Sequence, residues 1–161
     1  KFQRIFMKVI NNNDIRKLLD TSIHWKHLSV GQFLWAIGLH EGEGSFTFSY
    51  RGKYLQYARV KIAMSDLDVI ERAKTIWEAE RVGIDNSKKN CKLMYYTQVN
   101  IAAKDNNGKH IELLEIMKPY FSKRRQHQLE RTVIHALAHI IQMKTTKYNK
   151  LLKPKHRRKK A

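Results

Sequence analysis

The feature that most constrains the fold is an apolar helix that runs into an acidic, glycine-containing junction and then directly into an alternating strand. Ser29 and Gln32 have the spacing of a capping box at a helix start. Residues 33–39 are apolar on nearly every side, which predicts a helix buried on more than one face. We expect this helix to stop within the segment Glu41-Gly42-Glu43-Gly44, because glycine is favoured at helix ends.

Alternation of apolar and polar residues predicts strands after this helix. The expected strands are 45–51, 55–64, 82–86 and 92–102, and helices are expected at 67–80, 110–117 and 122–142. The resulting order is helix, two strands, helix, two strands, helix, helix. It indicates an α+β fold in which antiparallel hairpins form one sheet and the helices cover one of its faces.

The charge of the chain is strongly positive and unevenly distributed. The 32 Lys and Arg residues exceed the 14 Asp and Glu residues, for a net charge of +18. Half of the excess lies in residues 144–161, which hold nine basic residues and no acid. We therefore divide the chain into a basic N-terminal extension (1–28), a folded domain (29–143) and a basic C-terminal tail (144–161). A partner rich in phosphate is the first expectation from such a balance.

Several classes of protein are excluded by the sequence. Cys91 is the single cysteine, which rules out an intramolecular disulfide framework and a multi-cysteine zinc site, and fits a reducing compartment. No apolar run approaches the roughly 20 residues that span a bilayer, so we expect no membrane insertion. Polar residues 11–14 interrupt the N-terminus, which is unlike a signal peptide. The expected location is intracellular, in an organelle or a prokaryotic cytoplasm.

Two acids and two glycines at the end of the first apolar helix are the residues that carry chemistry. Glu41 and Glu43 lie where acids oppose the helix dipole, and a divalent cation is a natural group to offset that cost. Gly38 and Gly42 are four residues apart and share a helix face, so a second helix can approach closely there. Such a helix, packed on its own copy, brings two acids together on a two-fold axis.

The stretch Ala36 to Gly44, continued by Ser45-Phe46, resembles the motif of LAGLIDADG homing endonucleases. The sequence departs from the usual motif at Ala36 and Ile37, where the family usually has Leu and a small residue, and at His40, which replaces an apolar residue. Glu also replaces Asp at both acid positions, 41 and 43. The resemblance implies the family's αββαββα fold over residues 29–143, with a concave DNA-binding saddle formed by the antiparallel sheet. Since only one motif is present, it also implies a homodimer. The implied interface residues are Leu34, Ile37, Gly38, Glu41 and Gly42.

The resemblance further implies catalytic roles for a few residues. Glu43 would be the ligand of Mg²⁺, one from each subunit, and Glu41 would instead satisfy backbone donors at the junction. Lys61 on the second strand would organise water, and Lys123 or Arg124 would stabilise charge developing on phosphorus. The competing interpretations are a solvated loop acid, an ordinary phosphate or base contact, and a solvated helix start. His135 and His139 are four apart, but they lack a third ligand and are taken as core or surface histidines.

The face of the sheet away from the helices is expected to bind double-stranded DNA. Polar and basic side chains there suit a major groove, although any antiparallel sheet can have a solvated polar face. We expect bases to be read chiefly by Arg51, Lys53, Arg59, Gln98 and Asn100, and phosphates to be held by Lys88, Lys89 and the tail. The full set of predicted DNA-binding residues is Ser45, Thr47, Ser49, Arg51, Lys53, Tyr57, Arg59, Lys88, Lys89, Lys92, Gln98 and Asn100.

The sequence therefore predicts an intron-encoded type of homing endonuclease that makes staggered double-strand breaks in a long pseudo-palindromic site by Mg²⁺-dependent hydrolysis. Three alternatives stay open at this point. An intron RNA maturase, or another non-catalytic nucleic-acid binder, would use the same fold and basic sheet. A structural RNA-binding protein of ribosomal type would have no use for Glu43 and no dimer. A transcription regulator would bind a palindrome without cutting it.

Overall fold

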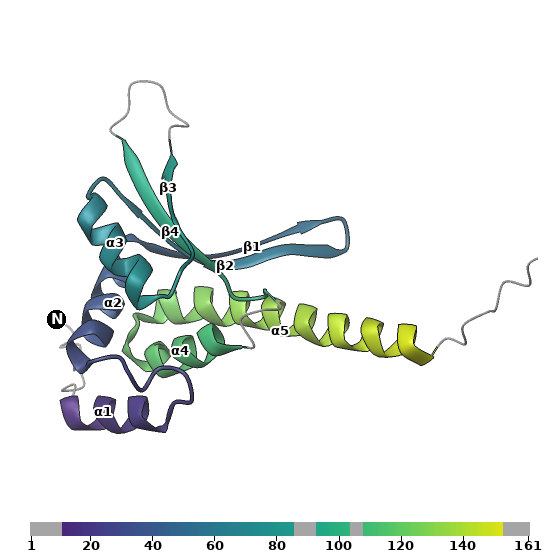
Figure 1. The fold of residues 1–161 in the computed structure, drawn as a ribbon, viewed down its shortest axis with the longest axis horizontal. Helices are drawn as coiled ribbons and strands as arrows, with labels where there is room; N and C mark the ends of the chain where they lie inside the picture. Colours follow the sequence, from purple (N-terminus) through teal and green to yellow (C-terminus); the bar gives the residue numbers. More distant parts are fainter. Residues whose placement is uncertain (1–10, 86–92, 104–107, 153–161) are drawn as a thin grey trace, which may run out of the picture.

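The structure is a computed structural model that describes residues 11–85, 93–103 and 108–152, with side chains described up to residue 146. Figure 1 shows the order of its elements. These are α1 (Asn12–Thr21), α2 (Val30–Glu43), β1 (Gly44–Arg51), β2 (Tyr54–Met64), α3 (Leu67–Ile76), β3 (Val82–Asp85), β4 (Met94–Asn100), α4 (Lys109–Met117), the 3-10 turn η2 (Lys118–Tyr120) and α5 (Lys123–Leu152). The predicted α+β fold class is confirmed.

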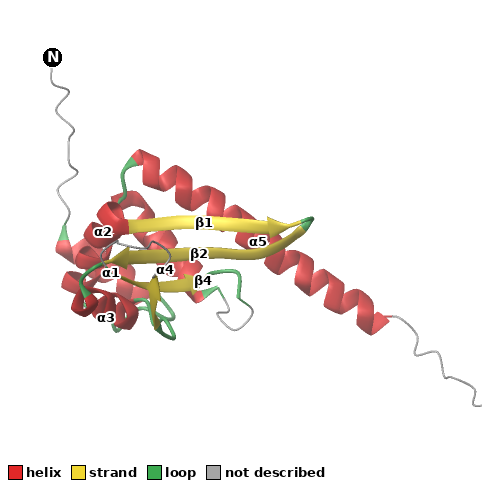
Figure 2. Cartoon of the chain, turned by 90° about the horizontal axis from the view of Figure 1, so that it is seen from above, coloured by secondary structure: helices red, strands yellow, loops and turns green. Residues whose placement is uncertain are grey.

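The strands form a single antiparallel sheet in the order β1-β2-β4-β3. The β1–β2 hairpin turns at Gly52, whose φ of 59° is a backbone conformation that glycine adopts without strain. Figure 2 looks onto the sheet with the strands in front and helices α2 and α5 behind them. Helices α2, α3 and α5 all contact the sheet. One face of the sheet is therefore covered by helices, and the other is left open.

The alternation of residues along the strands decides which side chains enter the core. Phe46 of β1, Val60 and Ile62 of β2 and Val99 of β4 are buried in one cluster with apolar residues of the helices. Their neighbours in sequence point to the open face, as the period of two along a strand requires. Because the apolar side chains of each strand pack against α2, α3 and α5, the polar side chains that alternate with them face solvent.

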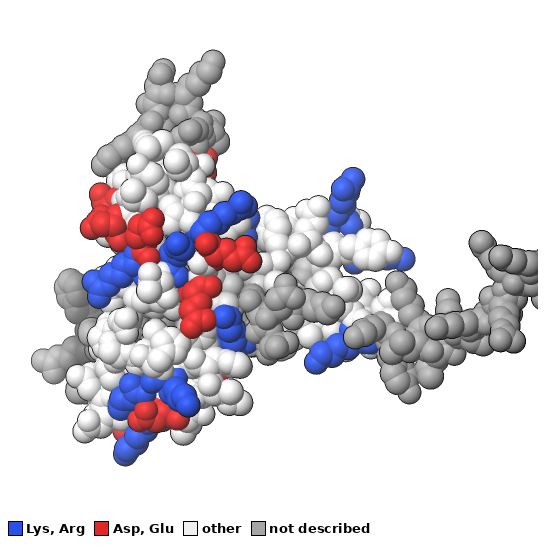
Figure 3. All heavy atoms as spheres, viewed as in Figure 1, with Lys and Arg blue, Asp and Glu red and all other residues white. Residues whose placement is uncertain are grey.

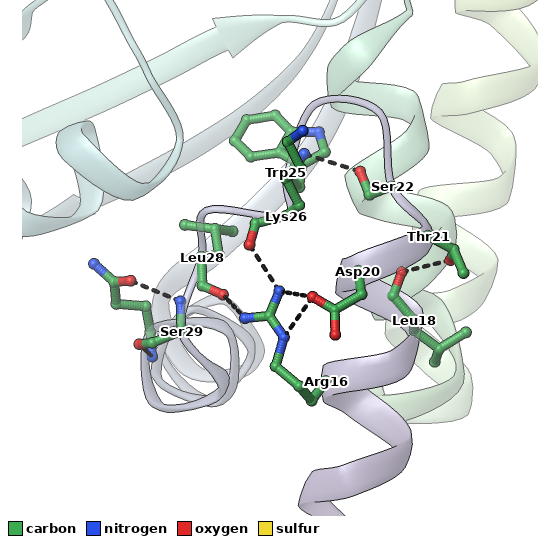
Figure 4. A network of polar contacts seen from close by, with 10 residues as sticks. Arg16, Leu18, Asp20, Thr21, Ser22, Trp25, Lys26, Leu28 and Ser29 are labelled. Atoms are coloured by element: carbon green, nitrogen blue, oxygen red, sulfur yellow. Dashed lines mark hydrogen bonds and ion pairs between the residues drawn. The ribbon is translucent and has the colours of Figure 1, made fainter.

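Residues 11–28 pack onto the body of the molecule. Ile15 and Leu19 of α1 and Trp25 of the following loop are fully buried in the same core. Figure 4 shows how Arg16 holds the loop in place: its guanidinium donates hydrogen bonds to the carbonyls of Lys26 (2.7 Å) and Leu28 (2.9 Å). Because the loop leads directly into the capped start of α2, these contacts fix where α2 begins.

Two helices end elsewhere than predicted, and one ends where expected. Helix α3 stops at Ile76 instead of residue 80, and Glu78, just beyond it, has a φ of 46°. Helix α2 ends at Glu43 with Gly44 as its C-cap, within the predicted segment 41–44. A Cβ at Gly44 would lie 2.3 Å from the ring of His40, so the close approach of that ring requires glycine there, and the helix ends where the chain becomes β1. Helix α5 runs to Leu152 instead of residue 142, because no helix-breaking residue occurs before Pro154. None of the described helices combines the length and apolarity needed to cross a membrane.

Candidate carboxylate site and nucleic-acid interface

Glu43 stands at the point where helix α2 passes into strand β1. It is the last residue of α2, its side chain is exposed, and it has no hydrogen bond or ion pair with any described residue. The next residues pair with β2 in the register Gly44 with Ile62 and Ser45 with Lys61. The structure therefore places an unpartnered carboxylate at the edge of the open sheet face, on the strand end that adjoins Lys61.

Glu41 is engaged with the start of helix α5. The backbone N–H of Ser122 donates to the Glu41 carboxylate (3.1 Å), and the Glu41 carbonyl accepts from Arg125 Nη2 (3.0 Å) and Nε (3.3 Å). The expectation that Glu41 satisfies backbone donors agrees with this geometry. These hydrogen bonds join the carbonyl end of α2 to the amino end of α5, and each helix end meets a group of opposite charge. We call this set of contacts among Glu41, Ser122 and Arg125 the clasp between α2 and α5.

Arg125 is the residue of this junction that sequence reasoning missed. Its side chain is buried, with an exposed fraction of 7%, and Nη1 donates a further hydrogen bond to Gln128 (3.1 Å). Lys123 and Arg124, the predicted catalytic cations, are exposed in the first turn of α5 and have no hydrogen bond or ion pair with a described residue. The sequence signal that distinguishes the buried Arg125 from the exposed Lys123 and Arg124 is helical spacing, because Arg125 lies four residues before the buried Leu129 and so shares its helix face.

His40 is buried directly beneath the junction. It is fully inaccessible, neither ring nitrogen has a hydrogen-bond partner among the described residues, and its ring packs 4.3 Å from the ring of Phe46. The rings of Trp77 and Phe121 complete an aromatic surround. Burial, and secondarily the nearby charge of Arg125, lower the pKa of His40 from its ordinary 6.5 to about 3. His40 is therefore a neutral core residue.

The open sheet face carries polar side chains in matched rows. Ser45, Lys61 and Gln98 form one row across β1, β2 and β4, and Thr47, Arg59 and Asn100 form the next. Strands β1, β2 and β4 contain no Asp or Glu. The predicted parity of these residues agrees with the structure, and the face is polar with positive charge at its centre.

Lys61 is held above an aromatic ring. Its ammonium lies 4.4 Å from the centroid of the Tyr96 ring, within the range of a cation–π interaction. Tyr96 pairs with Gly83 of β3, and a Cβ on Gly83 would lie 2.3 Å from the ring. The glycine therefore makes room for the ring, and the ring supports the lysine.

The other predicted DNA-binding residues differ in how they are placed. Arg51, Lys53 and the nearby Tyr54 lie exposed at the hairpin tip, where Figure 3 shows basic side chains projecting from the far end of β1–β2. The amide oxygen of Asn100 accepts the backbone N–H groups of Ala58 and Ala102, so part of this side chain serves the fold. Three predicted residues lie outside the described part of the chain: Lys88, Lys89 and Lys92.

The predicted interface helix leaves two glycines uncovered. Gly38 and Gly42 are exposed, and nothing lies within 4 Å of a Cβ added at either position. Leu34 is half-buried against the core, whereas Ile37, 7% exposed, belongs to the core of its own chain. The open strip of α2 is thus centred on Gly38 and Gly42, next to Glu43.

The described residues contain one exposed carboxylate near the junction and no larger cluster of metal ligands. No group of three or more His, Cys, Asp and Glu side chains suited to a metal ion occurs among them. The exposed carboxylate of Glu43 is a donor of the type that hard divalent cations prefer. One carboxylate alone does not complete the coordination of such a cation.

Comparison with known proteins defines the fold of the chain. Neither a protein-family model nor a curated protein matches it. Among solved structures, the archaeal intron-encoded homing endonuclease I-Vdi141I, in complex with DNA, is similar with a TM-score of 0.52 and 17% sequence identity. The match covers 81% of this chain and 89% of that one. The chain therefore has the fold of a homing endonuclease, as the resemblance of its motif predicted.

The clasp between α2 and α5 predicts an unequal effect of two neighbouring arginines. Replacing Arg125 by methionine keeps the apolar stem but removes the donors to the Glu41 carbonyl, and should lower the free energy of unfolding by about 2–3 kcal/mol. The matched change Arg124→Met, at an exposed position, should alter it by less than about 0.5 kcal/mol. Urea denaturation measures both, and equal effects would contradict the clasp.

The burial of His40 predicts a pH-dependent stability with a defined sign. Below pH 6.5 the unfolded chain binds a proton at His40, whereas the folded chain does so only near pH 3, so acid favours unfolding. Between pH 6.5 and pH 5 this residue should cost the folded state about 2 kcal/mol. Denaturation of the wild type and of His40→Leu at both pH values tests this, and a variant that loses as much stability as the wild type would refute it.

Proposed function

We propose that the protein is a homodimeric, site-specific homing endonuclease of the LAGLIDADG type. It binds a long pseudo-palindromic DNA duplex and makes a staggered double-strand break by metal-dependent hydrolysis of phosphodiester bonds. The observation that carries the proposal is the unpartnered carboxylate of Glu43 at the edge of a basic sheet face on which strands β1, β2 and β4 contribute no acid. Support comes from the fold shared with an endonuclease whose structure contains DNA.

The open sheet face is the proposed DNA-binding surface. Its two central cations, Arg59 and Lys61, are flanked by hydroxyl and amide side chains that donate and accept hydrogen bonds, which are the groups that read base edges in a major groove. Arg51 and Lys53 at the hairpin tip lie where a long duplex would continue past the sheet, and we assign them to contacts with the outer part of the target. Their exposure leaves both side chains free to follow phosphates.

The proposed active site contains residues from two copies of the chain. A divalent cation such as Mg²⁺, held between two Glu43 carboxylates, would supply Lewis-acid stabilisation of charge on the scissile phosphate. Lys61 lies on β2 and pairs with Ser45, just after the junction of α2 and β1. In the proposal it orients water beside that phosphate. Lys123 and Arg124 follow Ser122, which is bonded to Glu41, so both begin close to the junction and present positive charge to the backbone of the DNA.

The dimer forms in this proposal through the uncovered strip of α2. Without side chains at Gly38 and Gly42, the helix backbones of two copies approach closely, and the two Glu43 residues are brought to the two-fold axis. The clasp from Arg125 to the Glu41 carbonyl fixes the end of α2, and so fixes where each Glu43 emerges.

The assignment of Glu43 is tested by a pair of isosteric changes. Glu43→Gln removes the charge of the proposed metal ligand and should abolish cleavage of a DNA library in Mg²⁺ while binding is retained. Glu41→Gln keeps an oxygen that accepts from Ser122 and should retain cleavage within about tenfold of the wild type. Gel analysis of products and a binding assay on the same DNA provide the readouts.

Each alternative function gives a different result in that experiment. Equal cleavage by the wild type and Glu43→Gln would remove Glu43 from the chemistry. Binding without cleavage by the wild type would identify a non-catalytic nucleic-acid binder, and a preference for structured intron RNA over duplex DNA would identify a maturase.

The proposed interface predicts that a large side chain on α2 separates the subunits without unfolding them. A Cβ at Gly38 meets no atom within 4 Å in the single chain, and leucine favours a helix more than glycine does. The variant should keep its helical circular dichroism but sediment as a monomer, and DNA cleavage should fall by at least about a hundredfold. A dimeric, active Gly38→Leu protein would place the interface elsewhere.

A further inference from the structure

Arg59, at the centre of the open sheet face, is held from three directions. Its Nε donates a hydrogen bond to Thr47 Oγ1 on β1 (3.3 Å), and its Nη1 donates to Gln98 Oε1 on β4 (3.1 Å). Its guanidinium lies 4.1 Å from the centroid of the Tyr57 ring, two residues away on the same strand. Both neighbouring strands and the strand of Arg59 itself thus fix the guanidinium plane.

The held guanidinium still has donors to offer. Of the five N–H groups of an arginine side chain, two are used here, and Nη2 has no acceptor among the described residues. The side chain is half-buried, so part of its rotational freedom is already lost before any ligand binds. A planar donor group fixed in this way binds a matching pair of acceptors at a reduced entropic cost.

We propose that Arg59 determines the sequence specificity of this face by recognising guanine in the major groove of duplex DNA. Guanine presents two adjacent acceptors there, O6 and N7, and no other base does so. The fork of the guanidinium matches these two acceptors, as it matches a carboxylate or a phosphate. This inference rests on the proposed DNA-binding function and adds the identity of the base and of its reader.

The other cations of the face lack this arrangement. Lys61 is a single ammonium above the Tyr96 ring, which suits a point contact with a phosphate or water. Lys53 lies 5.6 Å from the Tyr54 ring at the hairpin tip, and no described acceptor orients Arg51. The amide oxygen of Asn100 is occupied by backbone donors. Among the described cations of this face, only Arg59 is oriented by two acceptors and a ring together.

The proposed dimer sets the number and symmetry of the guanines. Each copy contributes one Arg59, so a pseudo-palindromic target should contain one specified guanine in each half-site. The two guanines should lie at equal distances from the centre of the site, because the two sheet faces are related by the same two-fold axis.

The test is selection of bound sequences from a randomised DNA duplex by the full-length protein, with divalent cations withheld so that the DNA stays intact. The wild type should enrich guanine at one position of each half-site. Replacing that guanine in the selected duplex should weaken binding by roughly 5- to 150-fold. An enriched site without a guanine that depends on Arg59 would overturn the inference.

Three substitutions separate base reading from charge. Arg59→Lys keeps the charge but loses the oriented fork, so overall affinity and its salt dependence should persist while the guanine preference weakens, because an ammonium still donates to O6 or N7. Arg59→Gln should shift the preference at that position toward adenine, whose N6 and N7 match an amide. Lys53→Ala should weaken all sequences uniformly and leave the guanine preference intact. If Arg59→Gln selects the wild-type site with an unchanged guanine preference, Arg59 is not the reader.

The roles of Thr47 and Gln98 as positioning residues follow from the same contacts. A Thr47→Val, Gln98→Leu variant retains Arg59 but removes both of its acceptors, and its preference for guanine at the Arg59-dependent position should fall several-fold. An unchanged preference would show that the two contacts do not orient Arg59. Absence of any binding of the wild type to duplex DNA would overturn the proposed function together with this inference, whereas selective binding that ignores Arg59 would overturn the inference alone.

Discussion

The clasp between the end of α2 and the start of α5 is the interaction on which the candidate site depends. The carbonyl end of a helix carries partial negative charge and the amino end partial positive charge. At the carbonyl end of α2, the Arg125 guanidinium donates to the Glu41 carbonyl. At the amino end of α5, the Ser122 N–H donates to the Glu41 carboxylate. Because Glu41 makes both hydrogen bonds, the last turn of α2 cannot fray without exposing a buried arginine. Glu43, two residues later, therefore leaves the helix at a fixed point.

The sheet supplies a second constraint, which acts through the register of its strands. Gly44 pairs with Ile62 and Ser45 with Lys61, so the residue that caps α2 is also the first rung of the β1–β2 ladder. A shift of one residue would turn Phe46 and Val60 to solvent and bury Arg59. The apolar core and the polar face are thus consequences of one register, and the position of Glu43 relative to Lys61 follows from it.

Much of this was predictable from the sequence because strand alternation and helix capping are local. The parity of Thr47, Arg59 and Gln98 and the capping box at Ser29 agree with the structure. The clasp was predictable only in part: the spacing of Arg125 from the buried Leu129 indicates which of the three cations faces the core, but the tertiary position of α2 decides which group it bonds. The end of helix α2 within residues 41–44 was predictable from its glycines, whereas the close approach of the His40 ring to Gly44 was not. The assignment of Glu43, Lys61, Lys123 and Arg124 to catalysis stays a prediction.

The contrast between Glu41 and Glu43 connects the fold to the function that we propose. Both acids lie at the end of a helix, where a negative charge is unfavourable. The negative charge of Glu41 is stabilised by the hydrogen bond from the Ser122 N–H, and Arg125 donates to the backbone carbonyl of the same residue. Glu43 has no such compensation from any described residue, although the chain carries a net charge of +18. A carboxylate left exposed beside a basic sheet is free to accept a cation or a hydrogen-bond donor from beyond the described residues. In the proposed dimer, the Glu43 residues of two copies would hold a divalent cation beside a phosphate of the bound DNA.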